Sequence, residues 1–319
     1  MKNLVSIIIP LFNEEKNIPV LLKGIQEVMA AGNLAFEIIV VDDGSSDGTY
    51  EVIKELAAKD SRINGIRFRR NHGQTAAIMA GIEHARGEIS ITLDGDLQHD
   101  PQQIPEFLAK IKSGHDVVCS YRHKRNDALL RRFPSRVANY LARKFSGLEL
   151  KDFGSTYRAY KTSVAKEMPI YGEMHRFIPV FAGMLTDRIT EIPITLKPRQ
   201  YGESSYGLSR TFRVFSDLLL LLFFAGFCNR PIHMFGYISM ILGLPGFTIL
   251  GWLSVNKIFR QIQIMDYGPL FFMGVMLVLV AVQLFTTGIV CEYLIRIYYK
   301  KDNRQPYSLA ETTFAKSSE

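Results

Sequence analysis

Two long apolar runs near the C-terminus constrain this chain more than any other feature of its sequence. The first extends from Pro231 to Val255 and carries no charge when His233 is neutral; the second extends from Gly268 to Cys291 and carries none. A helix that crosses the ~30 Å hydrocarbon layer of a bilayer needs about 20 apolar residues. The alternative is a hairpin buried in a soluble core, which two such runs in succession disfavour. We therefore predict a transmembrane helix over each run, within residues 230–298.

Positive charge is distributed unequally around the two runs, and this predicts their orientation. The connector, residues 256–267, carries two basic residues and one acid, whereas the flanks carry more basic residues: Arg210, Arg213, Arg230, Arg296, Lys300, Lys301 and Arg304. Because positively charged segments stay in the cytosol, we expect both flanks to be cytosolic. Residues 208–229 are predicted to form a juxtamembrane amphipathic helix, and residues 299–319 a cytosolic tail.

Residues 1–207 have an ordinary composition for a water-soluble domain and alternate between strand and helix patterns. Apolar β-rich runs at 4–9, 36–41, 63–68, 89–93 and 116–120 are separated by helical patterns near 15–31, 47–59, 74–86 and 102–113. This order is typical of an α/β fold with a mostly parallel sheet and helices on both faces. We also expect a basic helix near 127–146 and extended segments over 153–161 and 189–197.

The N-terminus and the cysteines both favour the cytosol for this domain. The run at 4–9 is too short for a signal peptide, and three scattered cysteines fit neither a disulfide framework nor a zinc site. The formal net charge of +7 fits nucleic acid, anionic lipid or a phosphate-bearing substrate. Since the basic residues cluster near the predicted membrane face, without a nucleic-acid motif, we expect no nucleic-acid partner.

Two acidic motifs follow predicted strands. Asp42 and Asp43 end the second strand, and Asp94 and Asp96 follow the fourth. Ligands of open parallel sheets bind at the carboxyl ends of the strands, where carboxylates can accept hydrogen bonds from a uracil or a ribose. We predict nucleotide contacts for the first pair, although the neighbouring Asp47 is better explained as a helix cap. The second pair predicts a Mg²⁺ or Mn²⁺ site, since these ions take carboxylates together with substrate phosphates.

The motifs Ile7–Glu15, Val41–Ser45 and Asp94–Gln98 together resemble those of inverting family-2 glycosyltransferases of GT-A fold. With the two apolar runs, the chain is most similar to polyprenyl-phosphate glycosyltransferases: undecaprenyl-phosphate glucosyltransferases of the O-antigen type, dolichyl-phosphate mannose synthases and undecaprenyl-phosphate aminoarabinose transferases. The resemblance implies a GT-A, Rossmann-like sheet. It also implies a nucleotide-sugar site formed by Pro10, Asn13, Glu14, Asp42, Asp43, Asp94 and Gln98.

Basic residues between positions 122 and 206 carry the narrower resemblance. Arg122 follows the fifth predicted strand, and an Arg-rich helix start and an Asp-x-x-x-x-x-Arg segment from Asp152 follow it. The resemblance implies that acceptor phosphate is bound by Arg122, Arg131, Ser135 and Arg199. Arginine suits this role because its planar fork of donors matches phosphate oxygens. Ser205 stands where the family has a lysine, which removes one positive charge from this region.

The expected reaction is inverting transfer of one hexose, from UDP-glucose, to undecaprenyl phosphate. An acceptor phosphate with a second pKa near 6 is already ionised at neutral pH, so a strong general base is less necessary. Asp96, Asp152 and Arg122 are the predicted catalytic residues, and Asp94 and Asp96 the metal ligands. The family also implies a homotetramer in the bacterial inner membrane.

Other functions fit parts of the sequence. Mannose or aminoarabinose transfer would use the same motifs. A processive polysaccharide synthase is disfavoured because the single tryptophan, Trp252, lies inside a predicted span rather than in a Gln-x-x-Arg-Trp motif. A non-catalytic nucleotide-sugar sensor would tolerate loss of the metal carboxylates, yet Asp94 and Asp96 are both present.

Overall fold

A computed structural model describes residues 4–122, 143, 147–168, 170, 174–197, 231–261 and 263–301. The chain divides into two compact units, an N-terminal α/β unit and a C-terminal unit built on two long helices. The predicted basic helix near 127–146 and the amphipathic helix at 208–229 lie outside the described residues, apart from Arg143.

The α/β unit is built on a seven-stranded sheet with the order β3-β2-β1-β4-β6-β5-β7. Its strands are β1 (Val5–Leu11), β2 (Phe36–Asp42), β3 (Ile63–Arg67), β4 (Ile89–Thr92), β5 (Val117–Arg122), β6 (Arg158–Lys161) and β7 (Ile189–Ile194). All neighbouring strands run parallel except β6, which is antiparallel to both β4 and β5. The predicted mostly parallel α/β fold is therefore confirmed.

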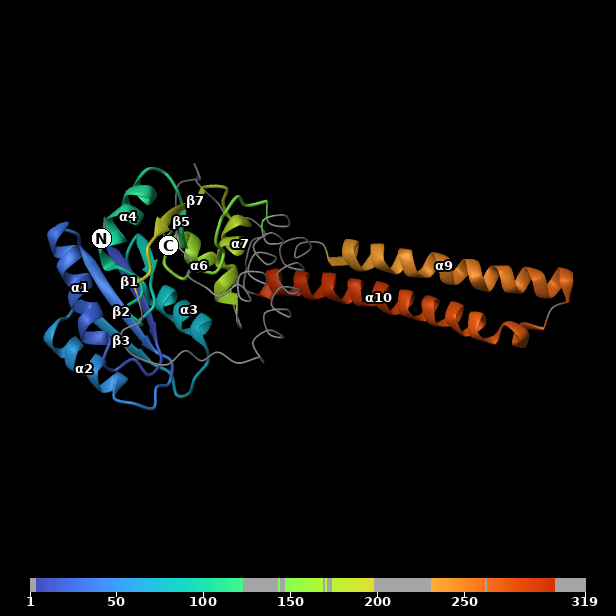
Figure 1. The fold of residues 1–319 in the computed structure, drawn as a ribbon, viewed down its shortest axis with the longest axis horizontal. Helices are drawn as coiled ribbons and strands as arrows, with labels where there is room; N and C mark the ends of the chain where they lie inside the picture. The colour runs from blue at the N-terminus through green and yellow to red at the C-terminus, as the bar shows by residue number, and fades with distance from the viewer. Residues whose placement is uncertain are drawn as a thin grey trace. The chain divides into compact units, whose positions relative to one another are not determined.

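Helices cover both faces of this sheet (Figure 1). They are α1 (Ile18–Ala31), α2 (Thr49–Lys59), α3 (Gln74–His84), α4 (Ile104–Lys112), α6 (Thr162–Glu167) and α7 (Ile178–Gly183), with 3-10 turns η1 (Pro101–Gln103) and η2 (Met174–Phe177). Residues Ile7 and Ile9 of β1 face a core shared with α1 and α4, whereas Ile8 points to the opposite face and contacts α3. That contact is so close that a Cβ on Gly81 would clash with Ile8 Cγ2.

Burial of the central strands explains why they appear in the sequence as unbroken apolar runs. All seven residues of β1 and of β2 are buried, as expected for central strands covered on both faces. The predicted extended segment 153–161 is a strand only over its last four residues. Residues before it instead form a loop that crosses the carboxyl end of β4, where Thr92 Oγ1 donates to the Thr156 carbonyl at 2.8 Å.

The second unit contains α9 (Pro231–Arg260), η3 (Ile264–Tyr267) and α10 (Gly268–Lys301), with α9 and α10 packed against each other. Both helices are long and apolar enough to cross a membrane, by length and composition. Each continues past its predicted apolar run, because charged residues such as Lys257 and Arg260 extend α9 without breaking its helical geometry. Gly246 lies at a close contact between the two helices, against Val278 and the Gly274 carbonyl.

Candidate active site

The predicted acidic pairs, Asp42 with Asp43 and Asp94 with Asp96, lie at or just after the carboxyl ends of β2 and β4. Asp42 ends β2, Asp94 follows β4 by two residues, and β1 lies between these strands. Backbone bonds join the strand ends, since Asp43 N donates to the Leu11 carbonyl at 2.8 Å. Gly95 packs so tightly against Leu11 that a Cβ there would clash with its side chain. The acidic motifs are therefore brought to one edge of the sheet.

The loop after β1 is joined to the loop after β2. Asn13 has a left-handed backbone with φ of 57°; its N–H donates to Ser45 Oγ at 2.9 Å, and its side-chain oxygen accepts from Ser46 N at 2.9 Å. Glu14 N donates to Thr49 Oγ1 at 3.0 Å. Pro10 is buried inside β1, paired with Val41, and its predicted contact with a nucleotide sugar stays a prediction.

Asp42 and Asp43 have different surroundings. Asp42 is fully buried; its Oδ1 accepts from Ser45 N at 2.9 Å, and its Oδ2 lies 3.4 Å from Arg67 Nε. Asp43 accepts from His72 N at 2.7 Å and from Gly73 N at 2.8 Å, one bond on each oxygen. Asp43 therefore holds the turn that begins α3, a role that the sequence did not indicate. Nucleotide contact by either carboxylate stays a prediction.

The Asp94 carboxylate is hydrogen-bonded on both oxygens. Gln74 Nε2 donates to Oδ1 at 2.7 Å, and Thr156 Oγ1 donates to Oδ2 at 2.6 Å. The Asp94 N–H donates to His99 Nδ1 at 3.2 Å, and the buried His99 ring lies 5.1 Å from that of Tyr157. Sequence reasoning missed Gln74, Thr156 and His99 as contributors to this site.

Asp96 and Gln98 belong to the same tight loop. Asp96 is 8% exposed, and its Oδ1 accepts from Gln98 N at 3.1 Å. Between them, Leu97 has a left-handed backbone with φ of 62°. The Gln98 carbonyl accepts from Lys197 N at 2.9 Å, which joins the loop to the segment that follows β7.

Arg122 and Asp152 form a two-pronged ion pair. Arg122 Nε donates to Asp152 Oδ2 at 2.6 Å, and its NH2 group donates to Oδ1 at 3.0 Å. Asp152 also accepts from Gly154 N at 3.0 Å and is 5% exposed. Such forked arginine–carboxylate pairs fix the orientation of the guanidinium. The remaining predicted phosphate ligands, Arg131, Ser135 and Arg199, lie outside the described residues.

The carboxylate oxygens of Asp94 and Asp96 are suitable ligands for a divalent cation of the Mg²⁺ or Mn²⁺ type. Both residues offer the carboxylate oxygens that these ions prefer, and an oxygen that accepts one hydrogen bond keeps a second lone pair for a metal. Among the described residues no group of three His, Cys, Asp or Glu side chains is arranged to hold a metal. Substrate phosphates and water are the ligands that usually complete the coordination of these ions beside one or two carboxylates.

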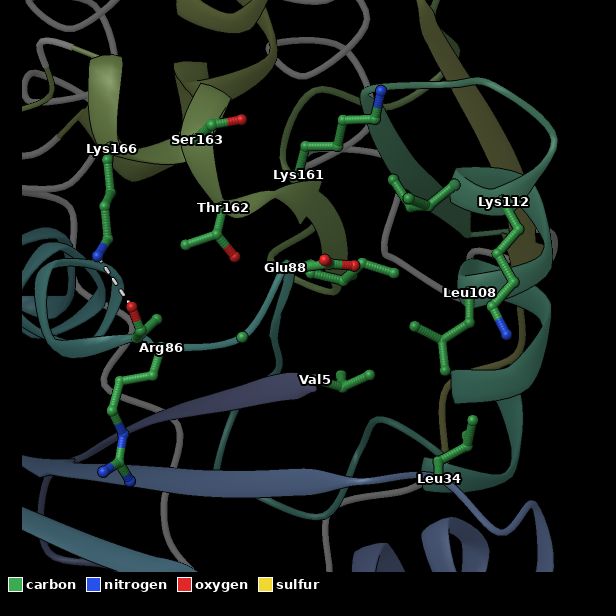
Figure 2. A pocket seen from close by; sticks show the side chains of 14 residues that line it. Val5, Leu34, Arg86, Glu88, Leu108, Lys112, Lys161, Thr162, Ser163 and Lys166 are labelled. Carbon is green, nitrogen blue, oxygen red and sulfur yellow. Dashed lines mark hydrogen bonds between the residues drawn. The ribbon is translucent and has the colours of Figure 1, made fainter. Parts of the chain in front are cut away.

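A cavity of about 610 Å³ lies elsewhere, against the first residues of β1 and β4 (Figure 2). Since parallel strands share their direction, this is the edge opposite to the aspartates. Three of its four cationic side chains have partners: Lys161 Nζ lies 2.7 Å from Asp116 Oδ1, Lys166 Nζ donates to the Ala85 carbonyl at 2.8 Å, and Arg86 Nε donates to Glu37 Oε2 at 2.8 Å. We therefore assign no role in the chemistry to this cavity.

A match to a known protein family agrees with this arrangement of carboxylates at the strand ends of a mostly parallel α/β sheet. The sequence profile of glycosyl transferase family 2 matches residues 6–168. The chain belongs to glycosyl transferase family 2 and is a glycosyltransferase.

Two relatives match almost the whole chain, including α9 and α10. Dodecaprenyl-phosphate galacturonate synthase of Rhizobium johnstonii is 39% identical, over 95% of this chain and 90% of its own length. Undecaprenyl-phosphate 4-deoxy-4-formamido-L-arabinose transferase of Salmonella choleraesuis is 32% identical, over 98% of this chain and 95% of its own length. The resemblance to polyprenyl-phosphate glycosyltransferases is therefore confirmed at the level of family membership.

Solved structures agree with the fold. Glucosyl-3-phosphoglycerate synthase from Mycobacterium tuberculosis, in complex with Mn²⁺, UDP-glucose and phosphoglyceric acid, superposes with a TM-score of 0.53 at 17% identity. The match covers 70% of this chain and 79% of that protein. At this identity the likeness shows a shared GT-A fold alone.

Proposed function

We propose that this protein transfers one sugar from a nucleotide-sugar donor to a polyprenyl phosphate, with inversion at the anomeric carbon. The observation that carries the proposal is the similarity to two polyprenyl-phosphate sugar transferases over 95% and 98% of the chain. A match confined to the α/β unit would support a glycosyltransferase but no lipid acceptor. The extension of both matches through α9 and α10 supports an acceptor that resides in a membrane.

In this mechanism an ionised oxygen of the acceptor phosphate attacks the anomeric carbon while the bond from that carbon to the nucleoside diphosphate breaks. The diphosphate leaves with the electron pair. Asp94 and Asp96 would hold the divalent cation, which neutralises charge on the departing diphosphate. The Arg122 guanidinium, oriented by Asp152, would bind the acceptor phosphate next to the donor and offset the repulsion between the two anions.

Undecaprenyl phosphate is the acceptor that we propose, and UDP-glucose the first donor to test. Galacturonate is a second candidate, because the relative at 39% identity is a galacturonate synthase. A 4-deoxy-4-formamido-L-arabinose donor is supported by the relative at 32% identity.

The proposed membrane arrangement follows the charge pattern. Residues 1–207 would form the cytosolic catalytic domain, residues 208–229 a helix on the membrane surface, and α9 and α10 two spans of a multi-pass protein in the bacterial inner membrane. Residues 299–319 would form a cytosolic tail, and the assembly would be a homotetramer. Labelling of single cysteines by a membrane-impermeant reagent tests the topology: a cysteine at Gln263 should react from outside intact spheroplasts, and one at Lys23 only after lysis.

The decisive experiment measures transfer of radiolabelled sugar to undecaprenyl phosphate in membranes, using UDP-glucose, UDP-galacturonate, a UDP-linked 4-deoxy-4-formamido-L-arabinose and GDP-mannose in turn. We expect lipid-extractable label from one donor, loss with EDTA and recovery with Mg²⁺ or Mn²⁺. Asp96→Asn should retain the protein in the membrane but lose the transfer. Nucleotide-sugar binding without transfer from any donor would instead support a sensor.

The role of Asp152 is tested by a conservative change. Asp152→Asn removes the charge that orients Arg122, and charged hydrogen bonds contribute about 1.5–3 kcal/mol, or roughly 10- to 100-fold. We expect kcat/KM for undecaprenyl phosphate to fall by this factor. An unchanged kcat/KM would leave Asp152 with a structural role only.

A further inference from the structure

The Asp94 carboxylate is held from two sides by elements that are distant in the sequence. Gln74, the first residue of α3, reaches Oδ1, and Thr156, in the loop before β6, reaches Oδ2. The side chain of Asp94 is nevertheless 29% exposed. One lone pair on each oxygen is therefore occupied by protein, while the carboxylate stays open to a ligand.

Gln74 is itself placed by Asp43. The Asp43 carboxylate binds the N–H groups of His72 and Gly73 at 2.7 and 2.8 Å, and Gly73 takes φ of 91° at the N-terminus of α3, a conformation that favours glycine. Gln74 follows directly. The Asp43 carboxylate, just after β2, thus fixes the turn from which Gln74 reaches the Asp94 carboxylate, just after β4.

Thr156 is placed by an equally well-defined set of bonds. Its carbonyl accepts from Thr92 Oγ1 at 2.8 Å, and the next carbonyl, of Tyr157, accepts from Ser120 Oγ at 2.7 Å. Arg158, only 1% exposed, donates to the Phe153 carbonyl at 2.8 Å. The loop that presents Thr156 is therefore bonded to β4 at this residue, to β5 just after it and to Arg158 of β6 just before it.

We propose that Gln74 and Thr156 are positioning residues that hold Asp94 in the orientation in which it accepts the divalent cation, and that Asp43 acts on the same carboxylate through Gln74. The inference rests on the proposed metal-dependent transfer. Without the two bonds, the carboxylate would rotate among several orientations and lose entropy on binding the ion. Removal of such outer-shell partners typically costs about 10- to 100-fold in metal affinity.

The chain supplies matched controls for both contacts. Gln26 Nε2 donates to Asp60 Oδ2 at 2.7 Å, and Thr186 Oγ1 donates to Asp116 Oδ2 at 2.6 Å, the same donor and acceptor types at the same distances as around Asp94. Gln26→Met and Thr186→Val therefore remove equivalent bonds from carboxylates outside the predicted site. Any general effect of losing a Gln–Asp or Thr–Asp bond appears in these variants too.

The test measures Mn²⁺ affinity of the full-length protein by electron paramagnetic resonance at saturating UDP, beside the Mn²⁺ dependence of transfer. We expect Gln74→Met and Thr156→Val to weaken Mn²⁺ binding by about 10- to 100-fold, with transfer partly restored at high Mn²⁺. Gln26→Met and Thr186→Val should bind Mn²⁺ as the wild type does. Thr156→Ser, which retains the hydroxyl, should restore the affinity and so separates positioning from a folding defect.

A double substitution tests the link through Asp43. If Asp43 acts through Gln74, Asp43→Asn combined with Gln74→Met should weaken Mn²⁺ binding no more than the stronger single change. Independent multiplication of the two effects would overturn that link.

The possible failures are distinguishable. Wild-type affinity in both Gln74→Met and Thr156→Val, in a protein that binds and requires Mn²⁺, would overturn the positioning role and leave the proposed function intact. A wild-type protein that neither binds Mn²⁺ nor loses transfer with EDTA would overturn the metal site and this inference together.

Discussion

In the α/β unit Ile38 and Phe107 are completely shielded from solvent, whereas in the helix pair Leu244 is 62% exposed and Ile258 72%. The two units use the same residue types in opposite ways. The first hides apolar side chains from water, which is the main driving force of its folding. The second turns them outward and uses small residues such as Gly246 where its helices meet, as helix pairs in lipid do. Burial of an apolar side chain therefore indicates stability only when the solvent around each unit is known.

The largest expected difference between the units concerns truncation of an apolar side chain. Ile38→Ala leaves a cavity in a closed core and should destabilise the α/β unit by about 2–5 kcal/mol. Leu244→Ala, on the exposed face of α9, should change stability far less. Peptide-resolved hydrogen exchange in lipid nanodiscs measures both units separately. Equal costs would show that protein rather than lipid covers Leu244.

A smaller effect is expected where the helix pair does pack closely. A Cβ at Gly246 would lie 2.9 Å from Val278 Cγ2 and 3.1 Å from the Gly274 carbonyl, whereas a Cβ at Gly251 meets nothing within 4 Å. Gly246→Ala should therefore destabilise the pair by about 1–3 kcal/mol, and Gly251→Ala should not destabilise it. Fluorescence of Trp252, the only tryptophan, follows unfolding of this unit. Identical unfolding of both variants would contradict the close packing.

A pH-dependent effect is expected in the α/β unit. Burial alone would raise the pKa of Glu37, but hydrogen bonds from Ser6 and Arg86 outweigh it and hold the pKa below its ordinary range. The stabilisation is therefore present above the unfolded pKa of about 4.3 and is lost as pH falls through the lower folded value. Glu37→Gln should cost about 1 kcal/mol at pH 7, and urea unfolding should show the difference from wild type shrinking below pH 4. A difference independent of pH would mean that packing, not charge, is responsible.

The smallest effect is expected on the water-facing surface. Lys23 Nζ lies 3.9 Å from Glu27 Oε1, with side chains 77% and 63% exposed. Since exposed pairs are screened by water and salt, Glu27→Gln should change the free energy of unfolding by less than about 0.5 kcal/mol. Urea unfolding of Glu27→Gln, measured in parallel with Glu37→Gln, provides the comparison. A loss of free energy of unfolding above this limit would contradict the weak contribution expected of an exposed pair.

Much of the site was predictable because its residues lie next to features with a local signature. Asp42 and Asp43 end a buried apolar run, and Asp94 and Asp96 follow another, so strand ends could be located from the sequence. Their partners had no such signature. Gln74 and Thr156 lie 20 and 62 positions from Asp94, and nothing in either local sequence indicates that contact.

Local sequence patterns are enough to predict the organisation of this chain: an α/β unit, two apolar helices, and acidic motifs at strand ends. Periodicity and length carry that information within short windows, because burial on both faces or in lipid selects residue types locally. Which side chains contact one another depends instead on the three-dimensional fold. The antiparallel β6 lies between β4 and β5, and the loop that precedes it carries Asp152 to Arg122 and Thr156 to Asp94. That insertion depends on the strand order of the whole sheet, which no local pattern encodes.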